Sequence, residues 1–526
     1  MTKTLVSFCD RMCLLSTVTS IENNSLPVVE PYYLSLFSGH SHLSTIGIIT
    51  NIAWAVGKPP MSKVMDVFGR AEGVMIATVL YFIGATLTSS ATSVTQYGIA
   101  RIASALGSQG LQLAQMILVA DTSSLASRAL LTSTISSPWI FTTWIGPVIG
   151  ARFKQMGEFG YRIIYVVFGI LVPLCAMLLV GRRDSQALLD DHCRRRNATQ
   201  ELWTQTWSEL DVLGILLLTL GFGMMLLPLS FGNNVTRHWA PGQCVSPIAL
   251  YICVLILLIF SRYESKYASY PIIPSRLLKQ RTIILGSSVC FWHFMCQYIY
   301  ESYFTSFLQV VRLSSPRDAQ YIQESYMFTA CVSALLCGVL VRWSRRYKIW
   351  VIVGVLAHSI GAMLMLRARN LDNPISEIVI SQVIAGFGGG FTTLASQLGV
   401  QAVVSHQDVG IATAVFLTVT QIGGAIGSSM AGAVWNSILP FELRKRLPLE
   451  EHDRIDRIVG DLDYILSFPD GSPIRESINS SYVEAQRMLN ILALVALLPC
   501  LLSALFMENV DLSGPREGTN SQPFSS

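Results

Sequence analysis

The chain alternates between long apolar runs and short polar connections over most of its length. Most runs approach the roughly 20 residues that an α-helix needs to cross the hydrocarbon of a bilayer. A backbone inside lipid must satisfy its own hydrogen bonds, so repeated runs of this length predict membrane-spanning helices. We therefore expect an all-α membrane protein with about 14 transmembrane helices.

The spacing of the runs predicts two bundles of six helices with two further helices inserted between them. A long outer loop in residues 439–487 alternates charged and apolar residues, which predicts a surface helix. This loop is either a cap that captures substrate or a solvated linker. The expected parts are an N-terminal bundle in residues 1–180, a cytoplasmic linker in 181–210, two inserted helices in 211–262, a C-terminal bundle in 281–507 and a disordered tail in 508–526.

The composition agrees with a protein embedded in lipid. Charged residues make up 13% of the chain and the mean hydropathy is +0.48, whereas a soluble domain carries about 25% charged residues. The net charge of +4 is small and spread over the loops, which gives no support for nucleic acid binding. The 11 cysteines are scattered without metal-site spacing. We therefore expect neither an enzyme nor a resident metal or cofactor.

Lys and Arg residues are distributed unevenly between the two sets of short loops. The connections after the second, fourth, sixth, eighth and tenth predicted helices hold clearly more of them than the connections on the other side. Short basic loops stay on the cytoplasmic side of a membrane. The bias therefore predicts that both termini are cytosolic.

The segment KPPMSKVMDVFGRAE, residues 58–72, joins two apolar runs. Pro59 and Pro60 are expected to end the preceding helix, because proline cannot continue its hydrogen bonding. The sequence therefore predicts a polar loop over this whole segment. Taken alone, such a loop is a positively charged turn that fixes the topology.

The same segment carries a recognisable pattern. Asp66-x-x-Gly69-Arg70 resembles the loop between helices 2 and 3 of the major facilitator superfamily. Four further residues make the segment resemble the fungal siderophore iron transporter branch of that superfamily: Lys58, Pro59, Lys63 and Glu72.

Two glycine-rich segments extend this resemblance. Gly146-Pro147-x-x-Gly150 is similar to a motif of superfamily exporters and of the siderophore branch, and GFGGGF, with Gly388 at its centre, lies within another apolar run. Glycines allow helices to approach closely, and proline bends a span, which suits a helix that rocks. Packing alone explains these residues equally well.

The resemblance implies a proton-driven importer of ferric siderophores, usually hydroxamates, that works by alternating access. Iron would travel inside its chelator, so the protein needs no metal ligands of its own. Members of this branch normally have a fuller first helix than residues 5–18, which contain adjacent Asp10 and Arg11. We therefore expect a degenerate or truncated first helix, followed from residue 19 by the end of that helix and an outer loop.

The run that ends near residue 311 contains one carboxylate, Glu301, among aromatic residues. A carboxylate in such surroundings is costly unless it faces water or a partner. We predict that Glu301 binds and releases the coupling proton, and that Tyr298 and Tyr303 form part of the cavity wall. The alternative is a position at the outer boundary, where Glu301 only forms a salt bridge.

Three further residues are candidates for substrate contact. Arg101 either reaches the headgroups or faces the cavity and pairs with substrate or a carboxylate, and Gln112 lies on the same predicted helix. Tyr482, in the segment SYVEAQR at the end of the long outer loop, is either a contact for an incoming siderophore or an interfacial aromatic anchor.

Other functions stay open at this point. The scaffold also suits a 14-helix drug–proton antiporter, a glutathione exchanger of the same branch, or a transport-inactive siderophore receptor or sensor. The expected location of a monomeric protein of this kind is the plasma membrane or an endosomal or vacuolar membrane.

Overall fold

The structure is a computed structural model, and it describes residues 2–37, 43–123, 125–179, 211, 213–217, 220–221, 245–268, 277, 279–371, 373–405, 408–460, 462–510 and 512. Within these residues the chain is helical and contains no strand. The predicted linker in 181–210, most of the first inserted helix and nearly all of the predicted tail lie outside the described residues.

The first group of helices packs around the contacts of α1 with α6 and α7, and of α4 with α2 and α3. The short helices α5 and α6 follow each other with only two residues between them. The bounds in this group are α1 (Thr2–Ser35), α2 (Leu43–Phe68), α3 (Arg70–Ser89), α4 (Val94–Thr122), α5 (Leu125–Ser136), α6 (Trp139–Gln155) and α7 (Gly157–Leu179).

The second group packs mainly through α13 with α18 and α21, and through α17 with α15 and α16. The bounds that follow α7 are α11 (Val245–Lys266), α13 (Arg281–Glu301), α14 (Phe304–Val311), α15 (Pro316–Ser344), α16 (Lys348–Ala368), α17 (Ile375–Ala402), α18 (Val409–Arg446), the 3₁₀ helix η3 (Leu449–Arg454), α19 (Ile455–Gly460), α20 (Leu462–Leu466) and α21 (Pro473–Phe506).

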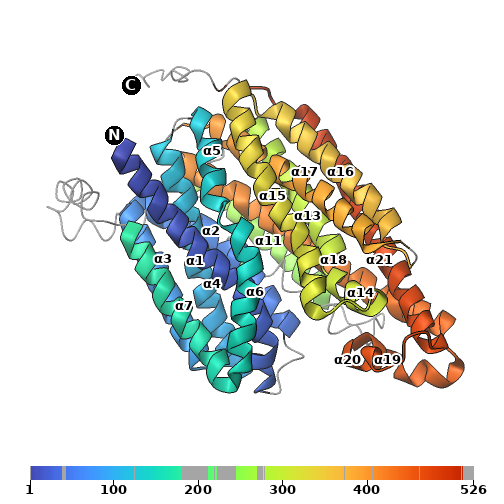
Figure 1. Ribbon diagram of the computed structural model, residues 1–526. Helices are drawn as coiled ribbons and strands as arrows, with labels where there is room; N and C mark the ends of the chain where they lie inside the picture. Colours follow the sequence, from blue (N-terminus) through green and yellow to red (C-terminus); the bar gives the residue numbers. More distant parts are fainter. Residues whose placement is uncertain are drawn as a thin grey trace, which may run out of the picture.

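The two groups stand side by side, α1–α7 in blue to teal and α13–α21 mainly in yellow to red (Figure 1). They touch where α18 meets α2 and α4, and where α15 meets α5 and α6. The start of α1 and the end of α21 lie at the same end of the molecule, opposite α19 and α20 (Figure 1). This arrangement leaves an interior between two half-bundles.

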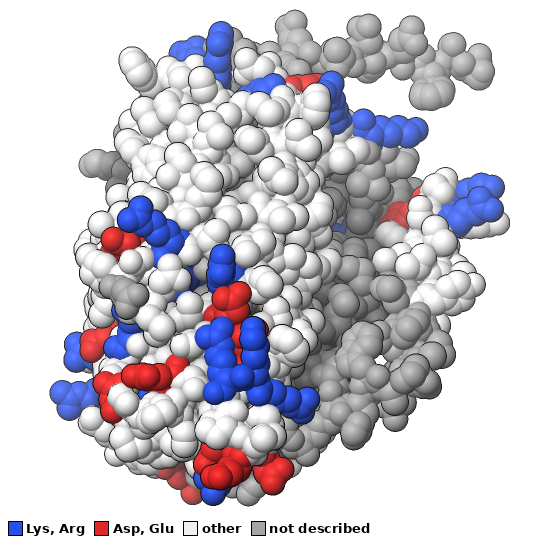
Figure 2. All heavy atoms as spheres, turned by 90° about the vertical axis from the view of Figure 1, so that its right-hand side faces the viewer, with Lys and Arg blue, Asp and Glu red and all other residues white. Residues whose placement is uncertain are grey.

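The surface of the bundle suits a lipid environment. Nine of the described helical segments are long and apolar enough to cross a membrane. Many large apolar side chains on these helices are exposed, as expected where lipid replaces water. Figure 2 shows a belt without charged side chains across the upper part of one face, with charged residues above it and over the lower part.

Helix α1 is continuous over 34 residues and ends at Ser35, within the segment that the sequence assigned to the end of this helix and an outer loop. It is not among the nine described segments that are long and apolar enough to cross a membrane. Its polar residues face the bundle: Glu22, Asn24 and Ser25 are buried. The Ser25 hydroxyl donates a hydrogen bond to the Gly146 carbonyl of α6 at 2.9 Å. Polar side chains on this helix therefore line the interior rather than mark its end.

The predicted loop in residues 58–72 is also largely helical. Helix α2 continues through Pro59 and Pro60 to Phe68, and only Gly69 separates it from α3. Prolines are tolerated inside membrane helices because neighbouring groups re-satisfy the freed backbone. Gly69 has φ 110°, a left-handed conformation that favours glycine, and so makes the turn possible in one residue.

Two spans predicted as single helices are broken. Residues 130–150 divide between α5 and α6 at Ser137 and Pro138, where proline removes a backbone donor. Residues 283–311 divide between α13 and α14 immediately after Glu301. The long outer loop is mostly helical, because α18 extends to Arg446 and α21 begins at Pro473, with η3, α19 and α20 between them.

Candidate functional site

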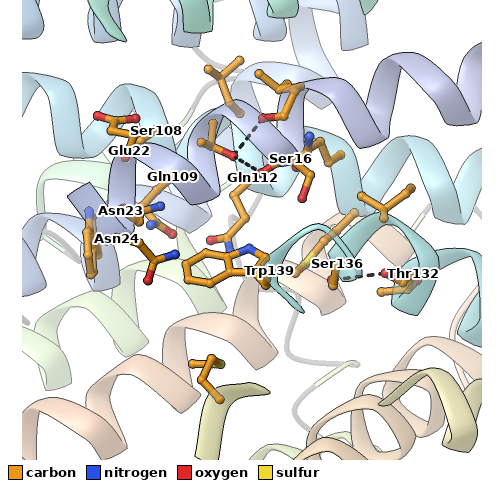
Figure 3. A pocket seen from close by; sticks show the side chains of 18 of the residues that line it. Ser16, Glu22, Asn23, Asn24, Ser108, Gln109, Gln112, Thr132, Ser136 and Trp139 are labelled. Carbon is orange, nitrogen blue, oxygen red and sulfur yellow. Dashed lines mark hydrogen bonds between the residues drawn. The ribbon is translucent and has the colours of Figure 1, made fainter. Parts of the chain in front are cut away.

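A cavity of about 370 Å³ lies between the two half-bundles and is lined by residues of both. This volume falls within the range of about 300–1,000 Å³ that is usual for small-molecule sites. Its wall combines aromatic, uncharged polar and acidic side chains from α1, α2, α4, α5, α6, α15 and α18 (Figure 3). The polar and aromatic members include Ser16, Thr19, Glu22, Asn23, Asn24, Trp54, Ser108, Gln109, Gln112, Gln115, Thr132, Ser136, Trp139, Glu324 and Gln421.

Several of these groups are available to a ligand. The side chain of Gln109 is 8% exposed, and its Oε1 atom has no hydrogen-bond partner among the described residues. The indole N–H of Trp54 is likewise buried and unpaired there. A buried polar group without a partner is costly. The cavity wall therefore offers at least one acceptor and one donor to a polar ligand.

A second cavity of about 180 Å³ adjoins the first and shares Glu22, Trp54 and Ser108 with it. Arg101 of α4 lines this second cavity, with its Nε atom 3.7 Å from a carboxylate oxygen of Glu30. That distance is an ion pair but too long for a hydrogen bond. Of the two alternatives for Arg101, the structure has the one in which it faces the interior and pairs with a carboxylate.

Glu301 is the last residue of α13, at the break before α14. Its carboxylate accepts a hydrogen bond from the Gln297 amide at 3.2 Å and interacts electrostatically with Arg369 and Glu324. Glu301 lines neither of the two cavities, but Glu324 lines the central one. Glu301 therefore lies outside both cavities, in the C-terminal half, and is linked to the central cavity only through its electrostatic interaction with Glu324.

The break after Glu301 has a physical basis. The break interrupts the helical hydrogen bonds and leaves the carbonyl of Tyr300 free for other donors. This carbonyl accepts hydrogen bonds from Arg369 at 2.8 Å and from Gln486 at 2.9 Å. The Arg369 guanidinium also lies 3.9 Å from the centre of the Phe304 ring. The buried side chains of Arg369, directly after α16, and of Gln486 in α21 thus replace the missing backbone bonds and hold the α13–α14 corner.

The three candidate tyrosines lie outside both cavities. Tyr303 stacks on Trp435 with ring centres 4.4 Å apart, and Tyr482 packs edge-on against Trp435 with ring centres 5.1 Å apart. Tyr298 lies against Gly424 of α18. The structure thus joins Tyr303 and Tyr482 in one aromatic cluster, in which Tyr482 is 3% exposed.

The charged motif at the α2–α3 turn ties three helices together. Arg70 forms an ion pair with Asp66 of α2, and its Nε atom lies 3.2 Å from Asp121 of α4. The Asp66 carboxylate also faces the start of α18, where a Cβ atom on Gly410 would lie 3.5 Å from it. A carboxylate at a helix N-terminus is stabilised by the helix dipole. Lys58, the first residue of the motif, is 2% exposed inside α2.

The motif glycines are positions of close helix contact. A Cβ atom on Gly146 or Gly150 of α6 would meet α1 at 2.3 or 2.5 Å, and Pro147 lies between them inside α6. A Cβ atom on Gly388 of α17 would lie 2.3 Å from the backbone nitrogen of His358 on α16. These glycines therefore allow backbones to approach at distances that no side chain permits.

Several cavity residues escaped the sequence interpretation. Glu22 lies in the segment assigned to the end of the first helix and an outer loop, so its burial had no visible signal. Glu324 is a carboxylate near the start of an apolar run, the same kind of signal that selected Glu301. Gln109 and Trp139 are ordinary helical residues, and only the packing of the two halves brings them to the cavity. In the part of the chain that the structure describes, no group of three or more His, Cys, Asp or Glu side chains could hold a metal ion.

The family model that describes the Major Facilitator Superfamily matches residues 12–428. The chain belongs to this superfamily. Its fold is similar to that of the proton:xylose symporter XylE, with a TM-score of 0.52 at 14% identity over 93% of this chain and 95% of that one. Members of the superfamily are transporters rather than enzymes, and the described helices agree with a multi-pass membrane protein.

Within the superfamily, the relatives are fungal siderophore iron transporters. The chain is 36% identical to the MFS siderochrome iron transporter C of Aspergillus fumigatus over 95% of its own length and 83% of the relative's. It is 35% identical to the siderophore iron transporter mirC of Emericella nidulans over 99% and 86%, respectively. A more distant relative, at 26% identity, is the low affinity heme transporter str3 of Schizosaccharomyces pombe.

Proposed function

We propose that this transporter imports ferric siderophore complexes of the hydroxamate type by alternating access, driven by proton symport. The observation that carries the proposal is the central cavity, whose wall comes from both half-bundles. A ferric hydroxamate presents amide and hydroxamate oxygens around an iron that its own ligands already saturate. Gln, Asn, Ser and Thr side chains supply hydrogen bonds to such a surface, and Trp54 and Trp139 supply apolar contact.

The substrate contacts follow from the two cavities. Gln112 faces a ligand in the central cavity, and Arg101 donates from the adjoining one. Tyr298, Tyr303 and Tyr482 act in this proposal on the outer side, where a rearrangement of the α13–α14 corner exposes their rings to the incoming complex. The contact of Asp66 with the start of α18 breaks when the cytosolic side opens.

Both termini are cytosolic in this proposal. Protection of a C-terminal tag from protease in intact cells would check this orientation.

Uptake of iron-labelled siderophores tests the transport function. In iron-starved fungal cells that lack other siderophore importers, expression of the chain is expected to cause intracellular accumulation of at least one ferric hydroxamate. Cell-surface uptake also places the protein in the plasma membrane, whereas uptake only into isolated vesicles places it in an internal membrane. Drug resistance without uptake would contradict the proposal, and so would surface binding or glutathione exchange without iron accumulation.

Substitution of Glu301 tests proton coupling. Glu301→Gln keeps the size and hydrogen bonding of the side chain, but an amide neither releases nor binds a proton at physiological pH. We expect its uptake to fall to the level that the unsubstituted protein shows with a protonophore, and to lose its dependence on external pH. Glu301→Asp, which keeps the carboxyl group, is the matched control and should retain pH dependence. Full pH-dependent uptake by Glu301→Gln would assign coupling to another group.

A further inference from the structure

Among the described residues, the charged side chains that line the central cavity are all acidic. Two carboxyl groups line it, Glu22 from α1 and Glu324 from α15, so each half-bundle contributes one. No Lys or Arg is among the described residues that line it. Arg101 lines the adjoining cavity, where it pairs with Glu30 and also interacts electrostatically with Glu22.

A second observation indicates that the cavity wall is suited to accept a hydrogen bond from a donor group on a ligand. The Oε1 atom of Gln109 is an acceptor without a partner among the described residues, on a side chain that is more than nine-tenths buried. Glu22 and Gln109 lie on the same side of the cavity in the view of Figure 3. An ammonium group carries three N–H donors and no acceptor, and so complements carboxylate and amide oxygens.

The ionised state of the carboxyl groups sets the selection. An ionised carboxylate attracts a cation, and the attraction is stronger where water is excluded. A protonated carboxyl group donates a hydrogen bond to a neutral carbonyl. An anionic ligand gains no charge partner in the cavity from the ionised state and is repelled by it.

We propose that this cavity sorts siderophores by the charge of the whole iron complex. It favours a ferric trihydroxamate that carries a free ammonium group, accepts the neutral equivalent and excludes the anionic one. This inference rests on the proposed import function and adds a determinant that the hydroxamate class alone does not set. The selecting residues are Glu22, Gln109 and Glu324.

Three forms of one chelate isolate the effect of charge. Ferrioxamine B carries one free ammonium group, its N-acetyl derivative is neutral, and its N-succinyl derivative carries a carboxylate; the iron centre is the same in all three. We expect the apparent KM of the N-acetyl form to be about tenfold higher than that of ferrioxamine B, the size of one hydrogen bond to a charged group. The N-succinyl form is expected not to accumulate.

Variants locate the selectivity in the cavity. Glu324→Gln is expected to bring the ratio of the KM for the N-acetyl form to the KM for ferrioxamine B toward one. Glu324→Asp is expected to keep this ratio. Gln421→Asn, which changes the same wall without a change of charge, should leave the ratio as it is. Gln112→Lys adds a cation and is expected to admit the N-succinyl form, so it supports the same conclusion if Glu324→Gln fails to fold.

The outcomes separate this inference from the function on which it rests. Equal uptake of all three complexes, or a preference for the N-succinyl form, overturns the charge selectivity and leaves import intact. No uptake of any form, together with no uptake of other ferric hydroxamates, overturns the import function itself. An unchanged KM ratio in Glu324→Gln, together with no uptake of the N-succinyl form by Gln112→Lys, overturns the assignment to this cavity.

Discussion

Gly388→Ala is expected to reduce the amount of folded protein sharply. The new Cβ atom would lie 2.3 Å from the backbone nitrogen of His358 and 2.5 Å from the carbonyl oxygen of Gly354. Both are backbone atoms of α16, so no side-chain rotation relieves the contact, and α16 and α17 must separate. Overpacking costs roughly 1–3 kcal/mol, and more where backbones move. The measurement is the thermal midpoint and yield of the detergent-extracted protein by fluorescence-detected size exclusion.

Gly98→Ala is the matched control for this prediction. Gly98 is also a helical glycine, in α4, but a Cβ atom there meets nothing within 4 Å. Alanine stabilises a helix interior by roughly 0.5–1 kcal/mol relative to glycine. We therefore expect Gly98→Ala to match or exceed the midpoint of the unsubstituted protein. Equal midpoints for the two variants would show that α16 and α17 do not pack as closely as the structure has them.

The sequence predicted the helices more reliably than their ends. An apolar run long enough to cross a bilayer is a local signal, so spans such as α7 and α16 follow from it. The break between α13 and α14 has no local signal, because Arg369 and Gln486 hold it from other helices. The polar residues of α1 show the same limit. Ser25 is unfavourable in lipid, but its hydroxyl donates to a carbonyl of α6, which the sequence alone does not place beside α1.

Only part of the candidate site was predicted from the sequence, for a similar reason. Arg101 and Gln112 were selected as polar residues within a predicted span, and both line a cavity. Glu301 was selected by the same rule, yet it lies at a helix break and lines neither cavity. The sequence shows that a polar residue lies within a membrane-spanning run. The direction in which its side chain points depends on the rotation of that helix about its axis. That rotation is set by contacts such as those of the motif glycines.

Arg101→Met is expected to abolish uptake and to destabilise the N-terminal half. The side chains of Arg101 and Glu30 are 16% and 18% exposed, respectively, so the substitution leaves a carboxylate with little access to water. Removing one partner of a buried ion pair costs roughly 3–5 kcal/mol. Glu30 also accepts a hydrogen bond from Tyr97 at 2.9 Å, which stabilises its charge only partly. Thermal stability in detergent and the initial rate of iron-chelate uptake measure the two effects.

The double variant Arg101→Met with Glu30→Gln separates pairing from substrate contact. Both charges are removed, so the desolvation penalty disappears and the thermal midpoint should return most of the way to that of the unsubstituted protein. If Arg101 also donates to the substrate, as we propose, the folded double variant still has a raised KM. A double variant with normal stability and normal uptake would restrict Arg101 to pairing with Glu30. A double variant as unstable as Arg101→Met would instead point to Glu22, the other carboxyl group in the same cavity, as the group that Arg101 stabilises.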